Sequence, residues 1–268
     1  VHGHDDGAPL LLVLGLGQQL TRWPMEIVER LVGEGFRVIR FDNRDIGLST
    51  WLDEAGAPDM PAVFTAVAGG RKPDVPYLLE DMADDAAGLL DALGIARAHV
   101  AGVSMGGMIG QTLAARHSAR VLSLVSVMST TGNPAVPPAT PEALAILYSR
   151  PEATDIDSLT EHALKAQIKL KAAIERAHHP VGMARQMCAV IGSGDRREAL
   201  KTITAPTIVL HGDADPLVRL EGGKDTAATI PGAELRIVEG MGHDMPQGVH
   251  AAFVAAGGAA AARARAAA

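Results

Sequence analysis

One serine in this sequence lies in a pattern that could make it a nucleophile. Ser104 is the centre of Gly-Val-Ser-Met-Gly at residues 102–106, after a strand-like run at 99–101 and before a helix-like stretch at 105–117. A Gly-x-Ser-x-Gly turn between a strand and a helix holds the serine in a strained backbone conformation with its hydroxyl exposed. The positions two residues away must be very small, and both are glycine here. The pattern also arises by chance, but the flanking strand and helix favour a nucleophilic serine.

The two other residue types that serine catalysis needs follow strand-like runs later in the chain. A serine hydroxyl needs a base to take its proton, and the base needs a carboxylate to orient it. The apolar run at 207–210 is followed by Asp215, and the run at 234–238 is followed by His243. The order serine, carboxylate, histidine, each just after a strand, is that of one known class of serine sites. We therefore predict that Ser104, Asp215 and His243 meet at one edge of a sheet as nucleophile, orienting acid and base.

Neighbouring residues compete for two of these roles. We favour Asp215 over Asp213 because the Gly-x-x-Asp spacing carries the loop past the strand end, and Pro216 stiffens the segment behind it. Asp213 is better suited to bracing the turn. His211 also follows a strand and could be a base, but a hydrogen-bonded structural histidine in this corner is the better interpretation.

A glycine-rich turn could supply the donors that a negatively charged reaction intermediate needs. An apolar strand-like run ends in Gly-Leu-Gly-Gln at residues 15–18, and such a turn can aim a backbone N–H at the space above the serine. We predict the amides of Leu16 and Met105 as an oxyanion hole, with Gly15 and Gly17 at the substrate pocket. Taken alone, the two glycines would indicate only a strand-to-loop turn.

Together these motifs resemble the α/β-hydrolase superfamily, and the resemblance covers nearly the whole chain. More narrowly, the sequence is similar to the bacterial branch that includes aclacinomycin methylesterase. The segments that carry this closer likeness are residues 11–15 (LLVLG), 38–50 (VIRFDNRDIGLST), 102–106 (GVSMG), 205–209 (APTIV) and 231–243. The resemblance implies an α/β fold with a mostly parallel sheet, helices on both faces and an inserted helical cap. It also implies that Ser104, Asp215 and His243 form a catalytic triad.

Two positions depart from the pattern of the wider superfamily. Leu14 stands where a histidine commonly precedes the oxyanion glycine, which matters little because the donor there is a backbone amide. Asp45 stands where a glycine usually follows the arginine of the Asp-x-Arg-Gly-x-Gly turn, and the methylesterase branch has an aspartate there too. Arg44 in this turn could clamp a substrate, but bracing of the loops behind the active site is the better interpretation.

Length and hydrophobic content allow one large core, or a core with a cap. The chain has 268 residues, of which 47% are hydrophobic. Strand and helix patterns alternate, which is typical of a parallel sheet covered on both faces. We predict strands at 10–16, 36–42, 98–103, 121–127, 206–211 and 234–239, and helices at 25–34, 79–93, 105–118, 219–229 and 244–256. Superfamily sheets usually begin with an antiparallel hairpin, and because only nine residues precede Leu10, we expect a missing natural start rather than a lost edge.

A long segment without a strand pattern separates two of the expected strands. It begins with several prolines, and its helix patterns lie at 142–148, 157–178, 181–191 and 196–203. We predict a hydrolase core at 1–130 and 204–268 and a helical cap at 131–203, where such enzymes usually select their substrates. Met183 and Met187 are candidate pocket residues. Packing within the cap is an equal alternative for these and for three further candidates: Leu164, Ile168 and Val190.

Composition also argues against several other classes of protein. The net charge of −7 argues against a nucleic-acid partner. No apolar run approaches the roughly 18–20 residues that span a bilayer, and no secretory leader is visible. The single cysteine, Cys188, excludes intrachain disulfides and fits a reducing compartment, so we expect a cytoplasmic protein. Neither metal-ligand spacing nor a phosphate loop is present, and we expect no metal and no cofactor. The Ala-rich tail at 251–268 is predicted to be a fraying helix.

The sequence favours a serine carboxylic ester hydrolase that acts on small or medium esters. The same triad would also serve a cofactor-free perhydrolase, a lactonase or a C–C bond hydrolase, and the fold has non-catalytic ligand-binding members. Epoxide hydrolases and haloalkane dehalogenases are disfavoured because those relatives use an aspartate nucleophile where Ser104 stands. Aromatic residues make up 3% of the chain, so little could stack on a large planar ring. An aliphatic pocket for short acyl or alkyl groups is the better expectation.

Overall fold

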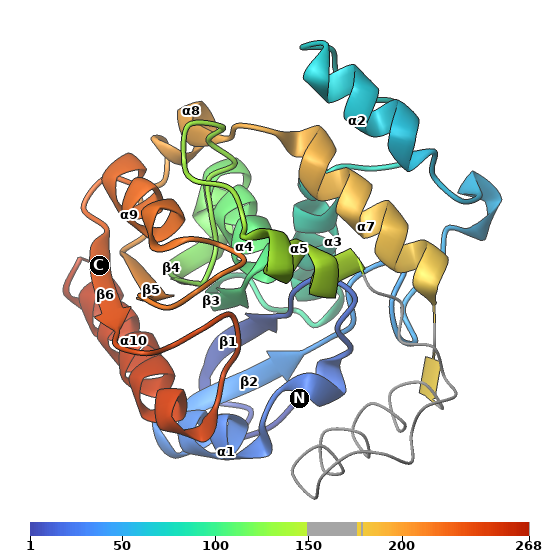
Figure 1. Cartoon of the computed structure of the whole chain (residues 1–268). Coiled ribbons are helices and arrows are strands. Elements are labelled where there is room, and N and C mark those ends of the chain that lie inside the picture. The colour runs from blue at the N-terminus through green and yellow to red at the C-terminus, as the bar shows by residue number, and fades with distance from the viewer. Residues whose placement is uncertain (149–175, 178, 268) are drawn as a thin grey trace, which may run out of the picture.

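The centre of the molecule is a six-stranded parallel sheet with the strand order β2-β1-β3-β4-β5-β6 (Figure 1). The computed structural model describes residues 1–148, 176–177 and 179–267. The strands are β1 (Ala8–Val13), β2 (Phe36–Arg40), β3 (Ala98–Val103), β4 (Val121–Val127), β5 (Thr207–Gly212) and β6 (Glu234–Val238). All six correspond to runs predicted from the sequence. The inner strands are mostly apolar, as expected where helices bury both faces of a parallel sheet.

Helices separate the strands and cover both faces of the sheet, as the alternating pattern predicted. They are α1 (Met25–Gly33), α2 (Met60–Ala68), α3 (Leu79–Ala92), α4 (Met105–Arg116), α5 (Pro141–Tyr148), α7 (Pro180–Ser193), α8 (Arg197–Leu200), α9 (Leu220–Thr229) and α10 (Gln247–Ala266). In Figure 1, α1 and α10 lie together on one face, and α3 and α4 lie on the other. The predicted α/β architecture is therefore confirmed.

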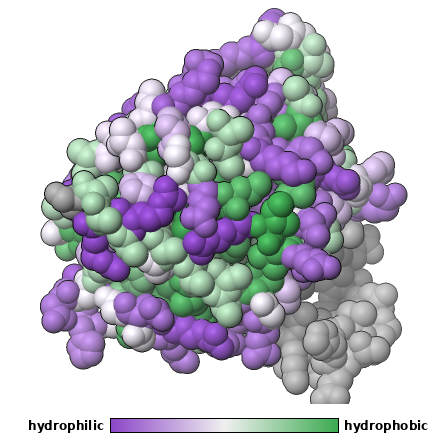
Figure 2. All heavy atoms as spheres, turned by 90° about the vertical axis from the view of Figure 1, so that its left-hand side faces the viewer, coloured by the Kyte–Doolittle hydropathy of each residue, from purple (hydrophilic) through white to green (hydrophobic). Residues whose placement is uncertain are grey.

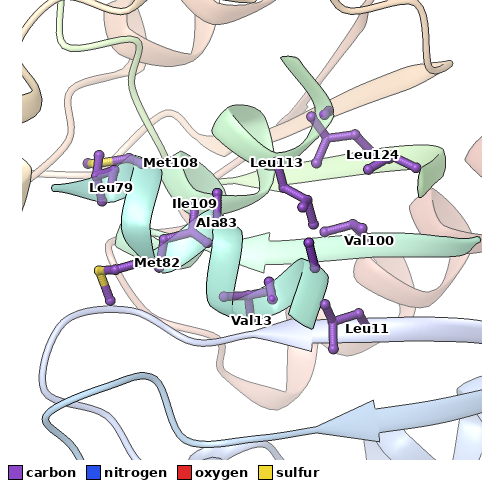
Figure 3. Packing of buried hydrophobic residues seen from close by; sticks show 14 of the residues in the cluster. Leu11, Val13, Leu79, Met82, Ala83, Val100, Met108, Ile109, Leu113 and Leu124 are labelled. Carbon is purple, nitrogen blue, oxygen red and sulfur yellow. The ribbon is translucent and has the colours of Figure 1, made fainter. Parts of the chain in front are cut away.

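Two buried apolar clusters hold these layers together. Figure 3 shows the first, in which Val13, Val100 and Leu124 of three neighbouring strands pack against α3 and α4. The second cluster lies between the sheet and the helices α1 and α10. In it, the centres of the Trp23 and Phe253 rings are 5.6 Å apart. Each large apolar side chain that is buried contributes about 1.5–3 kcal/mol. Two such clusters hold the sheet as a rigid platform for the loops at its carboxyl edge.

The strand order reverses beside β1, which places two loops next to each other. β1 pairs with β2 on one side and with β3 on the other. Open parallel sheets bind ligands beyond the carboxyl ends of the strands at such a reversal. The loop after β1 carries Gly15, and the turn after β3 carries Ser104. The topology therefore brings the predicted oxyanion loop to the predicted nucleophile.

The Ala-rich end of the chain is a packed helix, and the expectation that it frays was wrong. Helix α10 runs to Ala266, and its small residues Ala256, Gly257, Ala260 and Ala261 are buried. Small side chains let α10 lie close to α1 and to the sheet, so the low-complexity composition reflects close packing. Near the end of the helix, Arg263 donates to the carbonyl oxygens of Thr207 and Gly232 at 3.2 and 2.7 Å.

One helix was missed, and several predicted boundaries shift by a few residues. Helix α2 was not predicted; it begins at an Asp59 cap, whose carboxylate accepts from the amide of Ala62 at 3.0 Å, and it packs against α7. Strand β1 ends at Val13 rather than at residue 16, because the glycine-rich turn begins there. Helix α10 begins after Pro246, three residues later than predicted.

The two edge strands of the sheet, β2 and β6, have different surroundings. At the β2 edge, antiparallel pairing within the described residues is limited to a bridge between His2 and Val38. At the β6 edge, Glu234 accepts from Arg236 at 2.7 Å, and charged side chains of this kind discourage pairing with other chains. Figure 2 shows this side of the molecule, where hydrophilic residues surround smaller apolar areas.

The segment between β4 and β5 contributes helices α5, α7 and α8 to the part of the chain that the structure describes. Most of the helix predicted at 157–178, with the candidates Leu164 and Ile168, lies outside the described residues. Helices α7 and α8 correspond to the patterns predicted at 181–191 and 196–203. Helix α7 packs against α2 and α3, which places it beside the carboxyl ends of the strands (Figure 1). None of the described helices is long and apolar enough to cross a membrane.

Candidate active site

The turn between β3 and α4 holds Ser104 in a conformation that non-glycine residues rarely adopt. Its φ and ψ are 56° and −122°. Its amide donates to the Val127 carbonyl at 2.9 Å, and its own carbonyl accepts from Gly107 at 2.9 Å. A Cβ atom at Gly102 would overlap the Gly106 carbonyl, and one at Gly106 would overlap the Val13 carbonyl. The glycines of the motif are therefore a steric requirement of this turn.

His243 and Asp215 lie in line with the Ser104 hydroxyl. The Ser104 Oγ–His243 Nε2 distance is 2.9 Å, and the His243 Nδ1–Asp215 Oδ2 distance is 2.7 Å. A carboxylate only accepts hydrogen bonds, so Nδ1 carries the proton, and Nε2 is free to accept from the serine hydroxyl. The Asp215 side chain is fully buried, and its Oδ1 accepts from the amides of Leu217 and Val218, both at 2.9 Å. The structure thus brings together the three residues predicted from three separate strand ends.

The two competing residues near this chain of hydrogen bonds have other partners. Asp213 accepts from the Gly240 amide at 2.7 Å and so joins the loops after β5 and β6. His211 is fully buried and donates from Nε2 to the Val218 carbonyl at 2.8 Å. Burial lowers the pKa of His211, although the nearby Asp215 carboxylate opposes this. A neutral His211 therefore braces the loop of Asp215, in keeping with the structural interpretation.

The loop after β1 lies directly against the serine. A Cβ atom at Gly15 would be 3.2 Å from Cβ of Ser104. The Gln18 amide donates to the Gly15 carbonyl at 3.3 Å, and Gly17 has a φ of 67°, which is the geometry of a turn that needs glycine at its third position. Among the described residues, the amides of Leu16 and Met105 donate to no acceptor. Their role as oxyanion donors stays a prediction.

Of the predicted pocket residues on α7, one is in contact with this loop. A Cβ atom at Gly17 would be 2.9 Å from Sδ of Met183, so the methionine packs onto the glycine face of the turn. Met187 lies one turn further along α7 and is partly buried. The described contacts do not join Met187 to Ser104. Gly15 thus contacts Ser104, and Met183 contacts the same loop at Gly17.

Two residues that the sequence did not single out fix this loop in place. Asn43 is buried and donates from Nδ2 to the Leu14 carbonyl at 3.0 Å. Gln186 of α7 is also buried, and its Oε1 accepts from the Gly17 amide at 2.9 Å. Asn43 lies inside the segment at 38–50 that carries the family likeness, so this likeness could have pointed to Asn43. A glutamine within a helix gives no comparable signal.

Arg44 contacts the body of the fold. Its guanidinium pairs with both oxygens of Asp85, at 2.5 and 2.8 Å, and lies 5.1 Å from the centre of the Tyr77 ring. The hydrogen bonds from Arg44 to Asp85 raise the pKa of the guanidinium, so it remains charged. These contacts attach the loop after β2 to α3, which agrees with the bracing interpretation rather than with a substrate clamp.

The aspartate that replaces the usual superfamily glycine has a partner on α7. Asp45 and Arg185 are both fully buried and form a two-pronged ion pair, with N–O distances of 2.7 and 2.8 Å. Asp45 also accepts from the Tyr77 hydroxyl and from the Leu52 amide, both at 2.8 Å. Burial alone would raise the pKa of Asp45, but these hydrogen bonds outweigh it and lower the pKa. Through this ion pair, Asp45 attaches α7 to the loop after β2.

With this geometry, the sequence can be compared with known proteins. A family model described as the alpha/beta hydrolase fold matches residues 8–157, and one described as TAP-like protein matches residues 177–256. The chain therefore belongs to the α/β hydrolase family, and it is an enzyme of that family. Among the described residues, no group of three or more His, Cys, Asp or Glu side chains could hold a metal ion.

Several relatives are similar over nearly the whole chain. Rhodomycin D methylesterase of Streptomyces peucetius is 28% identical over 95% of this chain and 91% of its own length. A 2-hydroxy-6-oxononadienedioate/2-hydroxy-6-oxononatrienedioate hydrolase of Cupriavidus pinatubonensis is 29% identical over 91% of this chain and 84% of its own length. Among solved structures, a thermophilic esterase from Thermogutta terrifontis is 25% identical, with a TM-score of 0.63 over 92% of this chain and 88% of that one. The expected likeness to the methylesterase branch is confirmed.

Proposed function

We propose that this protein is a serine carboxylic ester hydrolase that acts on small to medium esters. The observation that carries the proposal is the unbroken line of hydrogen bonds from Asp215 through His243 to the Ser104 hydroxyl, with distances of 2.7 and 2.9 Å. Nucleophile, base and orienting acid lie within hydrogen-bond reach of one another without rearrangement.

The reaction follows from the protonation states in this line. His243 Nε2 takes the proton as Ser104 Oγ attacks the ester carbonyl, and Asp215 stabilises the imidazolium that forms. The Leu16 and Met105 amides bind the oxyanion of the tetrahedral intermediate. The imidazolium then protonates the leaving alcohol, and the C–O bond of the ester breaks to give the acyl-enzyme. Water, activated by the same histidine, hydrolyses the acyl-enzyme and restores the serine.

The segment at 131–203 acts in this proposal as a cap that selects substrates. Helix α7 supports it, because Met183 packs on Gly17 within the loop that lies against Ser104. The pocket is assigned to Gly15, Gly17, Met183 and Met187. A thioether-lined, aliphatic pocket suits short acyl or alkyl groups better than planar rings.

A second candidate is a C–C bond hydrolase that uses the same triad. It is favoured by the likeness to the Cupriavidus hydrolase, which is similar over 91% of this chain. That chemistry would still require Ser104 and His243, so loss of either residue does not separate the two candidates. The identity of the substrates that are turned over does separate them.

The test is hydrolysis of p-nitrophenyl esters with acyl chains of two to twelve carbons. Replacement Ser104→Ala should lower turnover by about 10⁴- to 10⁶-fold. Asp215→Asn should cost about 10⁴-fold because the imidazole loses its orienting acceptor. Asp213→Asn is the matched control, since Asp213 bonds a loop amide instead, and it should keep most of the activity.

The outcomes separate the candidate functions. Serine-dependent turnover that is highest for short acyl chains supports the esterase function and indicates the length of the acyl pocket. Full activity in Ser104→Ala would refute the assignment of the nucleophile. No serine-dependent turnover of any ester, together with cleavage of a vinylogous 1,5-diketone, would move the assignment to the C–C hydrolase.

A further inference from the structure

Gln186 is a buried glutamine whose two polar atoms both bind loops that surround the site. It is fully buried on α7. Its Oε1 accepts from the Gly17 amide at 2.9 Å, and its Nε2 donates to the Arg44 carbonyl at 2.8 Å. One side chain thus joins the loop after β1 to the loop after β2. Leaving either backbone group unpaired in this buried setting would be costly.

The bond to Gly17 acts on the turn that carries the Leu16 amide. The hydrogen bond from Gln18 to Gly15 closes this turn, and its first peptide group, between Gly15 and Leu16, carries the N–H that is the proposed oxyanion donor. The next peptide group, between Leu16 and Gly17, is the central one of the turn and can rotate between two turn types. Gln186 accepts from the N–H of this central peptide, so it stabilises the turn with a positive φ at Gly17.

Helix α7, which carries Gln186, is itself held against the segment that follows β2. The neighbouring residue Arg185 forms the buried ion pair with Asp45, and it also donates to the Gly56 carbonyl at 2.8 Å. On the other side of the loop, Asn43 binds the Leu14 carbonyl. The amide oxygen of Gln186 therefore has a fixed position relative to Gly17, as a positioning group requires.

We propose that Gln186 is a positioning residue for the oxyanion hole, acting through the Gly17 amide on the orientation of the Leu16 N–H. The inference rests on the proposed function, because it needs an oxyanion at Ser104. Among the described residues, the hydrogen bonds of Gln186 go to Gly17 and Arg44 and not to the triad. Its effect is on the transition state, where charge develops, and much less on binding of the uncharged ester.

The variant Gln186→Met removes both hydrogen bonds and keeps the length and shape of the side chain. Removal of one oxyanion donor typically costs about 10²- to 10³-fold in kcat, and a misplaced donor should cost less. We expect kcat to fall by about ten- to hundredfold, with KM changed by less than about threefold.

Gln111→Met is the matched control for loss of a buried glutamine. Gln111 is fully buried on α4, donates to Ser126 Oγ at 2.9 Å and accepts from Arg196 at 3.3 Å. These partners lie outside the loop after β1. The control should lose thermal stability to a similar degree but keep kcat within about threefold of the parent.

A trifluoromethyl ketone inhibitor separates positioning from a general loosening of the site. It adds to Ser104 and places an oxyanion where the transition state has one, so its inhibition constant should rise by the same factor as kcat/KM falls. Equal kcat values for parent and Gln186→Met, or an unchanged inhibition constant, would overturn the inference. A parent enzyme with no serine-dependent ester turnover would instead overturn the proposed function.

Discussion

The buried ion pair between Arg185 and Asp45 makes a quantitative prediction about stability. The replacement Arg185→Met removes two of the four donors that Asp45 has, and leaves the Tyr77 hydroxyl and the Leu52 amide. The arginine and the aspartate are both fully buried, so the remaining carboxylate is a buried charge that has lost its guanidinium partner. We expect the variant to fold with a much lower free energy of unfolding.

The size of this effect follows from the contacts that remain. Removing one partner of a buried pair typically costs about 3–5 kcal/mol. Because two neutral donors stay on Asp45, a cost near the lower limit, about 3 kcal/mol, is expected for Arg185→Met. For chains of this length that corresponds to a fall in Tm of about 6–12 °C. A change of less than about 1 kcal/mol would contradict the account of the pair.

In the same variant, the contribution of Asp45 to the free energy of unfolding should depend on pH with the opposite sign. In the parent, the hydrogen bonds depress the pKa of Asp45, so its contribution is present above the unfolded pKa, about 3.9, and is lost as the pH falls through the folded pKa. Without Arg185, burial dominates and raises the folded pKa above the unfolded value. Stability is then lost as the pH rises from about 4 towards the raised pKa.

Urea denaturation between pH 5 and pH 8 measures this reversal directly. The gap in unfolding free energy between the parent and Arg185→Met should widen with pH. The double variant Asp45→Asn/Arg185→Met carries no buried charge and should recover stability at pH 8. His179 lies 3.9 Å from the same carboxylate, so His179→Gln in both backgrounds is the control. A gap that is independent of pH, with no recovery in the double variant, would refute the reasoning.

Three shorter predictions test the pocket and the packing. Met183→Ala should enlarge the acyl pocket and shift the preferred ester to longer chains, measured with the p-nitrophenyl series. Gly15→Ala places a Cβ 3.2 Å from Cβ of Ser104 and should lower kcat about tenfold or more with little change in Tm, because displacement by about 1 Å can cost 10²-fold. Ala256→Leu should destabilise the fold by about 1–3 kcal/mol through overpacking, whereas the same change at the exposed Ala255 should be within about 0.5 kcal/mol in thermal denaturation.

The sheet could be predicted because its buried parallel strands are short runs of mostly apolar residues. β5 and β3 are buried at every position, and their predicted bounds are within a residue of those observed. Helix α2 could not be predicted in the same way. Most of its residues are apolar although several are exposed, among them Phe64 and Val67, so it lacks the periodicity that marks a helix with one buried face.

The arrangement of the site could be anticipated because its side chains follow strand ends whose positions the topology fixes. Ser104, Asp215 and His243 each lie beyond a strand, and strand ends of a parallel sheet share one edge. Gln186 and Gly17 are 169 positions apart in sequence and are joined by one hydrogen bond. That contact depends on how α7 packs, and no local pattern encodes it.

The position of β6 at the edge of the sheet has a consequence for how activity is lost. β6 is the least buried strand of the described sheet and has β5 as its one neighbour in the strand order. Edge elements with few buried contacts open at lower free energy than the whole fold does. His243 follows this strand, so local opening there would separate the proposed base from Ser104 while the central strands stay paired. In mild denaturant, ester hydrolysis should therefore vanish before the global unfolding transition, and turnover would report on the least stable cooperative unit of the molecule.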